Sequence, residues 1–354
     1  MRAELASLLF TTIALTTCLG FADAQKKDQL TTHQPELFRV TRDTVNVSIE
    51  GRLYSALLVQ NKYYAFYHVR DSMSSAPIRK FYIIAKNGQI EKEIKLPKGL
   101  LEDTYPKMYY WRGQIYVITE FYKGTYLLLE SQGRFEQLPE IVDIPLFENE
   151  RTAVTSECHG EFGSTIYFKN KSTGIIYSSH AGCPVVVNKV GDNYFINVSG
   201  MPYSDIVEIA DPVVTNTTAA PKAKVVFEKD DLGADFYIPT SFLVDSTLYL
   251  IYNYNHDELG FDDKTERTVV TGDSVKIGTI RDGVFNPVYI FKDKFHIELE
   301  QQVTPNYQIC TFHTEDRVQI GFKADHPPYM ESKYGVIEIA DDEIWIHYFI
   351  SKRQ

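Results

Sequence analysis

Hydrophobic and polar residues alternate along most of this chain in short runs, which glycine, asparagine or aspartate separates. The clearest runs combine aromatic with β-branched or aliphatic residues, and they lie at 61–67, 112–118, 163–168, 245–251 and 342–348. Alternation with a period of two predicts half-buried strands, because successive side chains point to opposite faces of a sheet. A strand unit that recurs roughly every fifty residues, with no helical segment between copies, predicts a β-propeller.

Turn residues divide the predicted strands into blades of four antiparallel strands. Three outer hairpins share a tight turn, at Asn87-Gly88, Gln132-Gly133 and Asp282-Gly283, where glycine supplies the positive φ that the turn needs. First strands are expected near residues 52, 104, 151, 192, 236, 295 and 334, and outer hairpins at 81–95, 126–138, 175–187 and 275–291.

The number of blades depends on how the two chain ends are used. The last two predicted strands, 336–340 and 343–350, lack an outer hairpin, and the N-terminal segments 37–42 and 45–50 lack inner strands. We expect both ends to complete one blade, which removes open sheet edges and closes the ring. The pattern therefore favours an all-β propeller of seven blades over one of six, and a pair of β-sandwiches is the competing fold.

The first residues have the form of an export signal. Arg2 precedes an apolar stretch at 8–19, and Ala22-Asp23-Ala24 offers small residues for cleavage. We expect a signal peptide at 1–24, a flexible linker at 25–35 and one propeller domain at 36–354; a lipid anchor on Cys18 is the alternative. No later segment of the sequence is long and apolar enough to span a membrane. The expected location is extracellular, or periplasmic in a bacterium.

The net charge narrows the range of partners. The whole chain carries −11, and the signal segment accounts for −1 of it (Arg2 against Glu4 and Asp23), so −11 − (−1) leaves −10 after cleavage. An acidic surface repels phosphate backbones, so nucleic acid is not an expected partner.

Long connections are expected to gather at one end of the propeller. Connections between second and third strands and between blades share that end, which the predicted strands assign to segments 71–77, 97–103, 139–150, 211–223, 229–235 and 253–267. Long loops on one face of a rigid scaffold are where such folds usually bind their ligands.

The candidate binding site consists of acidic and aromatic residues in these long segments. Residues 255–263 hold the densest group, which a hard cation such as calcium could bind through oxygens, although the EF-hand pattern is absent. A solvated acidic loop is the simpler interpretation, and no cofactor is required. The candidates are His256, Asp257, Glu258, Asp262, Asp263, Asp230, Asp231, Asp103, Tyr105 and Tyr122, with Glu102, Glu148, Glu150 and Asp235 adding to the acidity.

Two covalent modifications are predicted. Cys158 and Cys183 are expected to form a disulfide on the face opposite the long loops; free thiols, or a zinc site with His159 and His180, are the alternatives. If the source is a eukaryote, the sequons at Asn170 and Asn216 lie in predicted loops and are the better glycosylation candidates.

These features favour a secreted, non-enzymatic binding protein that recognises an extracellular protein or carbohydrate through its acidic long-loop face. The alternative is a carboxylate-dependent glycoside hydrolase, with pairs such as Asp103 with Asp231, or Glu150 with Asp257, flanking the substrate. A structural coat component is the third possibility. The sequence contains no sialidase Asp box, Gly-x-Ser-x-Gly or His-Glu-x-x-His motif.

Overall fold

Short strands joined by tight turns make up almost all of the described structure, which is a computed structural model. Residues Phe38–Gln354 form one unit, and the expected signal peptide and linker (1–35) lie outside the described residues. In the part of the chain that the structure describes, no helix has the length and apolar character needed to cross a bilayer. The structure describes residues 37–69, 78–102, 106–119, 124–158, 164–200, 203–215, 220–227, 235–255, 259–262, 267–270, 274–293, 299–300, 308–309, 311–314, 317–326 and 330–351.

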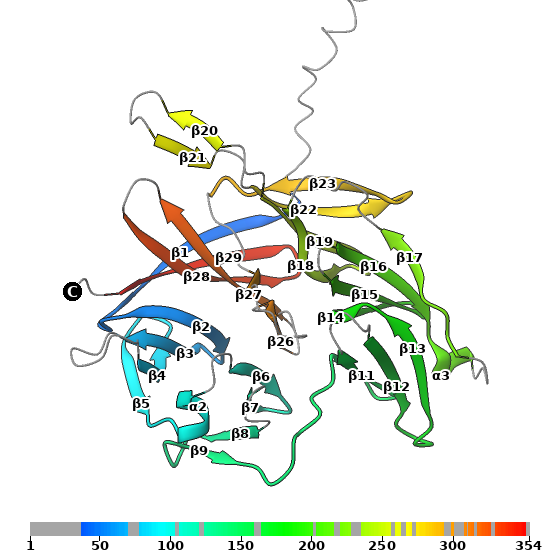
Figure 1. The fold of residues 1–354 in the computed structure, drawn as a ribbon, viewed down its shortest axis with the longest axis horizontal. Helices are drawn as coiled ribbons and strands as arrows, with labels where there is room; N and C mark the ends of the chain where they lie inside the picture. Colours follow the sequence, from blue (N-terminus) through cyan, green and yellow to red (C-terminus); the bar gives the residue numbers. More distant parts are fainter. Residues whose placement is uncertain are drawn as a thin grey trace, which may run out of the picture. The chain divides into compact units, whose positions relative to one another are not determined.

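Six sheets of four or five strands form the blades of a β-propeller, numbered here along the chain (Figure 1). Blade 1 contains β2 (Arg52–Val59), β3 (Lys62–Val69), β4 (Ile78–Ala85) and β5 (Ile90–Ile94). Blade 2 contains β6 (Lys107–Trp111), β7 (Gln114–Thr119), β8 (Gly124–Leu129) and β9 (Arg134–Gln137). Blade 3 contains β10 (Phe147–Glu148), β11 (Thr152–Cys158), β12 (Ser164–Asn170) and β13 (Ile176–Ala181).

The second half of the chain forms the other three blades. Blade 4 contains β14 (Cys183–Val190), β15 (Asn193–Gly200), β16 (Tyr203–Ala210) and β17 (Lys224–Phe227). Blade 5 contains β18 (Asp235–Val244), β19 (Thr247–Asn255), β22 (Ser274–Arg281) and β23 (Val284–Ile290). Blade 6 contains β26 (Thr311–Thr314), β27 (Arg317–His326), β28 (Met330–Ala340), β29 (Glu343–Ser351) and β1 (Arg39–Val47).

Four smaller elements lie in the connections between these strands. They are α2 (Lys98–Glu102), α3 (Pro212–Thr215), the two-stranded sheet of β20 (Leu259–Asp262) with β21 (Arg267–Val270), and that of β24 (Leu299–Glu300) with β25 (Gln308–Ile309).

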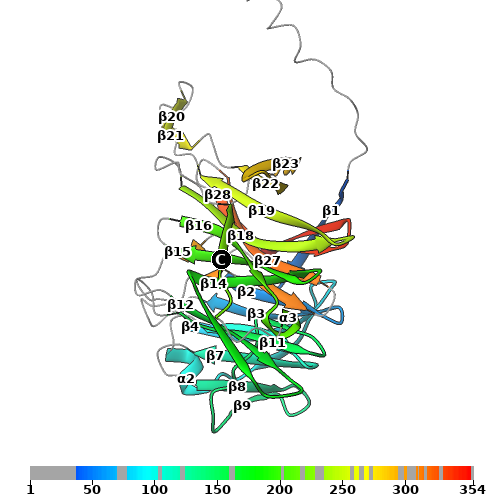
Figure 2. The ribbon, with the colours of Figure 1, turned by 90° about the vertical axis from the view of Figure 1, so that its right-hand side faces the viewer.

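The described strands form six blades, and the expected seventh blade is not among them. β27 and β28 pair with each other along most of their length, and β29 continues the same sheet, so the strands assigned to a sixth and a seventh blade form one. The N-terminal segments form a single strand, β1, which pairs in parallel with β29, so the first and last described strands share blade 6, as expected (Figures 1 and 2). The sandwich alternative is wrong, and the blade count was wrong because two long neighbouring strands gave the pattern of two separate blades.

The boundary between blades 3 and 4 also differs from the prediction. Residues 175–187 were expected to form one outer hairpin, but β13 ends blade 3 and β14 begins blade 4, with Gly182 between them. In β14, Pro184 follows the first residue and lies beside a bulge, and the strand continues into buried Val186 and Val187. An apolar run of this kind fits the outer strand of one sheet or the inner strand of the next, so the pattern alone cannot assign it.

The three tight turns are confirmed. Gly88, Gly133 and Gly283 have φ values of 89°, 66° and 74°, a region that side chains with a Cβ rarely adopt. Each turn joins the third and fourth strands of its blade, which fixes the register of the outer hairpin.

Buried apolar clusters fill five of the junctions between neighbouring blades. Blades 1 and 2 share the cluster around Phe66, Phe81 and Phe135, and blades 6 and 1 share the one around Tyr63 and Val336. Further clusters join blades 3 and 4, 4 and 5, and 5 and 6. Among the described residues, no such cluster joins blades 2 and 3.

Antiparallel strand order defines two ends of the propeller. We call the end with the turns at 60–61, 112–113, 191–192 and 245–246 the turn face, and the opposite end the loop face. Every connection longer than five residues leaves strands at the loop face, except 211–223, which was expected there but lies at the turn face.

Two further expectations about these faces are wrong. Cys158 ends β11 and Cys183 begins β14, so both backbones lie at the loop-face end instead of the turn face. Glu148 lies at the turn-face end, because β10 pairs with β11 and turns the chain at 149–151. The sequence pattern did not reveal this two-residue strand. Because β10 is the first strand of blade 3, β11 is its second, and each later strand of the blade runs in the direction opposite to the predicted one.

Candidate functional site

Most of the sequence-predicted binding residues lie outside the described part of the chain. For Asp262 the structure gives only its place in β20, where its backbone lies opposite that of Arg267 in β21. The acidic loop site therefore stays a prediction, as does calcium binding there. The candidates outside the described residues are Asp103, Tyr105, Tyr122, Asp230, Asp231, His256, Asp257, Glu258 and Asp263.

The predicted modifications are placed only in part. Cys183 is disulfide-bonded, but the side chains of the other cysteines lie outside the described residues, so pairing with Cys158 stays a prediction. Asn170 ends β12, and its side-chain oxygen accepts hydrogen bonds from the backbone N–H and hydroxyl of Ser172 (3.0 and 2.8 Å). Asn216 lies outside the described residues, and glycosylation of either asparagine stays a prediction.

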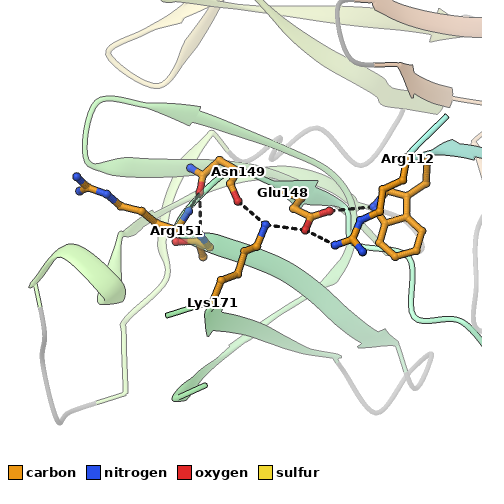
Figure 3. A network of polar contacts seen from close by, with 7 residues as sticks. Arg112, Glu148, Asn149, Arg151 and Lys171 are labelled. Atoms are coloured by element: carbon orange, nitrogen blue, oxygen red, sulfur yellow. Dashed lines mark hydrogen bonds and ion pairs between the residues drawn. The ribbon is translucent and has the colours of Figure 1, made fainter. Parts of the chain in front are cut away.

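The junction between blades 2 and 3, called here the 2–3 seam, contains a network of polar contacts (Figure 3). Glu148 accepts hydrogen bonds from the Trp111 indole N–H (2.9 Å), the Arg112 guanidinium (2.8 Å) and the Lys171 ammonium (2.8 Å). The Arg112 guanidinium also lies 4.3 Å from the centre of the Trp111 ring, a cation–π contact. One carboxylate thus joins turns of both blades.

Local structure explains why Glu148 points into this seam. Its neighbour Phe147 packs with the cluster of blades 3 and 4, and strand alternation directs Glu148 to the opposite side. The Asn149 side chain accepts hydrogen bonds from the N–H groups of Arg151 and Thr152 (2.9 and 2.8 Å), which fixes the turn after β10. Lys171 reaches the Asn149 carbonyl as well (2.9 Å).

The charge state of Glu148 follows from these contacts. Its side chain is 20% exposed. Burial raises its pKa, but hydrogen bonds from Lys171, Arg112 and Trp111 outweigh that effect and lower the pKa to about 2. The carboxylate is therefore ionised throughout the physiological range.

The two faces of blade 3 differ sharply. Val154, Ile166 and Phe168 are fully buried against blade 4. On the other face, directed toward blade 2, Glu157, Lys169, Ile176, Ser178 and His180 are exposed, and Ala153, Thr155, Thr165 and Tyr167 are half-buried. The facing wall of blade 2 holds the half-buried or buried side chains of Tyr109, Trp111, Tyr116, Ile118 and Leu127. The 2–3 seam thus has one polar, accessible wall and one aromatic wall.

A second carboxylate beside this seam, Asp143, lies within electrostatic range of Glu157. The Tyr167 hydroxyl donates a hydrogen bond to Glu157 (3.0 Å). Asp143, in the connection from β9 to β10, is exposed, yet partial desolvation and, secondarily, the charge of Glu157 raise its pKa.

A second polar group is structural. Glu338 is fully buried and interacts with Arg317 and with His347 Nε2 (3.2 Å). Burial raises the Glu338 pKa, but hydrogen bonds from His347 and Arg317 outweigh that effect and lower it. The group joins three strands of blade 6, and because Glu338 and His347 are enclosed, a ligand has no access to them.

A cavity of about 690 Å³ lies between blades 4 and 5. Sequence reasoning did not find this cavity. Its lining residues are Val190, Phe195, Lys224, Val225, Val226, Thr247, Leu248, Thr279, Ile280, Arg281, Asp282 and Gly283.

Comparison with known proteins gives a fold likeness only. No family model and no curated protein matches the chain. The β-propeller domain of the Trilobed protease from Pyrococcus furiosus is 11% identical, with 84% of this chain and 83% of that chain covered and a TM-score of 0.35. A thermostable family-43 glycoside hydrolase is 8% identical (84% and 92% covered, TM-score 0.31). An endo-1,4-beta-xylanase from Bacteroides thetaiotaomicron is 14% identical (86% and 98% covered, TM-score 0.28). The assignment to the β-propellers rests on the strand order of the chain itself.

Proposed function

We propose that this β-propeller is an exported, non-enzymatic binding protein that recognises an extracellular glycan or protein through its acidic loop face. One observation carries the proposal: the long connections, with the one exception of 211–223, leave strands at the same end of the propeller. Rigid blades hold the bases of these loops, and binding residues concentrate in loops that a rigid scaffold positions. In the sequence, the acidic segments 228–234 and 256–273 connect strands whose described ends lie at this face.

The experiment compares charge removal at the two ends. The loop-face variant carries Asp230→Asn, Asp231→Asn, Asp257→Asn and Glu258→Gln. The matched control carries four neutralised carboxylates that are not in loop-face connections: Asp245→Asn, Asp282→Asn, Glu91→Gln and Glu93→Gln. Asparagine tolerates the positive φ of Asp245 and Asp282 (46° and 52°), so the control should fold.

Both variants and the parent protein are tested on a glycan array and in pull-downs from the extracellular medium of the source. Loss of about tenfold or more in affinity for the same ligand in the loop-face variant alone supports the proposal. Equal binding by all three proteins, or equal loss in both variants, contradicts it.

A carboxylate-dependent glycoside hydrolase is the second candidate, and the Asp143 and Glu157 carboxylates in the 2–3 seam favour it. In such an enzyme one protonated and one ionised carboxyl flank the glycosidic bond. Release of sugar from a polysaccharide panel, abolished by Asp143→Asn and by Glu157→Gln but not by Glu136→Gln, would establish this activity. No release from the panel by the parent protein argues for the binding function.

Export and disulfide formation belong to the same proposal. Cleavage after Ala24 leaves Gln25 as the first residue, which N-terminal sequencing of the secreted protein tests directly. Non-reducing peptide mapping should recover Cys158 linked to Cys183. A peptide that links Cys183 to another cysteine would refute this pairing.

A further inference from the structure

The cavity between blades 4 and 5 lies beside a packed core. Ile206 and Phe227 of blade 4 meet Ile238 and Leu250 of blade 5, and all four are buried. The cavity is lined by the turn-face parts of both blades, including the ends of β14 and β22 and the start of β19. Apolar packing therefore closes the part of the junction around these four residues, and the cavity remains open at the turn-face part. We call this cavity the wedge.

Six of the twelve residues that line the wedge are apolar. Phe195, Val226, Leu248 and Ile280 are partly buried and pack against the core cluster while they also line the cavity. Its volume, about 690 Å³, falls within the usual range for small-molecule sites, and such sites combine apolar walls with a few polar groups. An apolar ligand body would gain affinity here by leaving water.

The rim supplies a cation. Arg281 is exposed and lines the cavity, and no ion pair of Arg281 occurs among the described residues. The other lining cation, Lys224, lies 3.6 Å from Glu208, so its charge is partly balanced. Asp282 follows Arg281 in the tight turn and also lines the cavity. A guanidinium offers two parallel N–H donors, a geometry that matches a carboxylate.

We propose that this wedge binds an amphipathic carboxylate, with the apolar body between blades 4 and 5 and the carboxylate on Arg281. This site is independent of the proposed loop-face function, because its lining residues come from the turn-face parts of both blades. The net charge of −11 opposes long-range attraction of an anion. Affinity must therefore come from apolar burial and one short-range ion pair.

The first test uses saturated fatty acids as probes. Octanoate, decanoate and dodecanoate are titrated below their micelle concentrations, with displacement of the fluorescent probe 8-anilinonaphthalene-1-sulfonate as the readout. Each methylene that becomes fully buried should tighten Kd about fourfold. Dodecyltrimethylammonium, which has the same tail and the opposite charge, should bind at least tenfold more weakly than dodecanoate. Equal affinity for the two head groups would overturn the proposal.

Variants locate the binding. Val226→Trp fills the wedge and should abolish saturable binding of dodecanoate, whereas Val284→Trp, at a 61% exposed position of β23 that does not line the cavity, should not. If Val226→Trp fails to fold, Thr247→Trp at the exposed rim takes its place. Binding that survives in both filled variants would overturn the proposal.

Arginine replacements test the ion pair. Arg281→Gln should weaken dodecanoate binding about tenfold and should not weaken binding of dodecyltrimethylammonium, whose positive head group the arginine repels. The matched control, Arg134→Gln, changes an exposed arginine next to the equivalent tight turn of blade 2 and should have no effect. Equal effects of the two replacements would refute the assignment of the carboxylate to Arg281.

Sedimentation tests whether the wedge takes a second copy of the chain instead. If the parent protein self-associates and Val226→Trp abolishes this self-association, the proposal is wrong.

Discussion

The junction between blades 1 and 2 and the 2–3 seam both contain a carboxylate at the turn face, yet different forces hold the two junctions. At the first, Glu130 accepts hydrogen bonds from Tyr64 (2.6 Å) and Lys62 (3.1 Å), and buried aromatic residues pack beneath it. In the 2–3 seam Glu148 makes three such contacts, but no buried apolar cluster accompanies them among the described residues.

The difference matters because apolar packing and ion pairs respond to different conditions. Burial of apolar surface is non-directional and changes little with pH. A carboxylate network needs its charge and its geometry, and it loses both when the carboxylate is protonated or its partners separate. The 2–3 seam should therefore be the first junction of the ring to open, and the exposed wall of blade 3 is already accessible there.

Removal of an aromatic ring from the apolar junction should have the largest effect. Phe81 is fully buried, and its ring lies 4.8 Å from that of Phe66 and 5.0 Å from that of Phe135 across the junction. Phe81→Ala should lower the free energy of unfolding by about 3–5 kcal/mol, because it removes packing and leaves a cavity. Urea denaturation measures this loss. Phe81→Leu should cost clearly less, and equal losses for both variants would contradict the packing argument.

Loss of the seam carboxylate should have the next largest effect. Glu148→Ala leaves Arg112 and Lys171 without their shared partner and should lower the free energy of unfolding by about 1–3 kcal/mol. Hydrogen exchange should rise in β6, β7 and β10 and stay unchanged in blade 1. The control is Glu136→Ala, which removes an exposed ion pair with Arg134. If hydrogen exchange rises evenly over all blades, the seam is not a separate weak point.

The pH dependence of stability sharpens the same comparison. The pKa of Glu148 is about 2 in the folded protein, against 4.5 for an unperturbed glutamate. Because its pKa is lowered in the folded state, ionised Glu148 stabilises the fold fully above pH 4.5 and loses this contribution as the pH falls to about 2. The difference in unfolding free energy between parent and Glu148→Gln should therefore be constant above pH 5 and shrink toward pH 2. A constant difference over this whole range would contradict the ionised state of Glu148.

Loss of the carboxylate from the apolar junction should have the smallest effect. Glu130 is 42% exposed, and exposed ion pairs contribute about 0–1 kcal/mol. Glu130→Gln should lower the free energy of unfolding by less than 1 kcal/mol, as measured by urea denaturation beside Glu148→Gln. A larger loss for Glu130→Gln than for Glu148→Gln would reverse the comparison.

A near-repeat in the sequence shows what a local pattern can predict and what it cannot. Residues 206–211 and 336–341 read Ile-Val-Glu-Ile-Ala-Asp and Val-Ile-Glu-Ile-Ala-Asp, and both end a strand, as the alternation predicts. Asp341 is an exposed turn residue with positive φ. Asp211 is fully buried, pairs with Lys189 and accepts a hydrogen bond from the N–H of Val213 at the start of α3. One local pattern thus has two environments.

The functional candidates show the same limit. The seam carboxylate Glu148 was expected on the loop face, because a two-residue strand leaves no periodic signal. The wedge between blades 4 and 5 depends on how two sheets diverge, which no single strand encodes. The acidic loop residues were selected by composition, and they lie largely outside the described structure.

The sequence by itself determined that the chain forms strands, where most of them turn, and that they belong to a propeller. Those features depend on side-chain alternation and on glycine at positive φ, and both are local. Only the tertiary structure decided that there are six blades, that one junction is polar and that a wedge stays open between blades 4 and 5. Each of these depends on which side chains meet across sheets, and residues far apart in the chain determine that together.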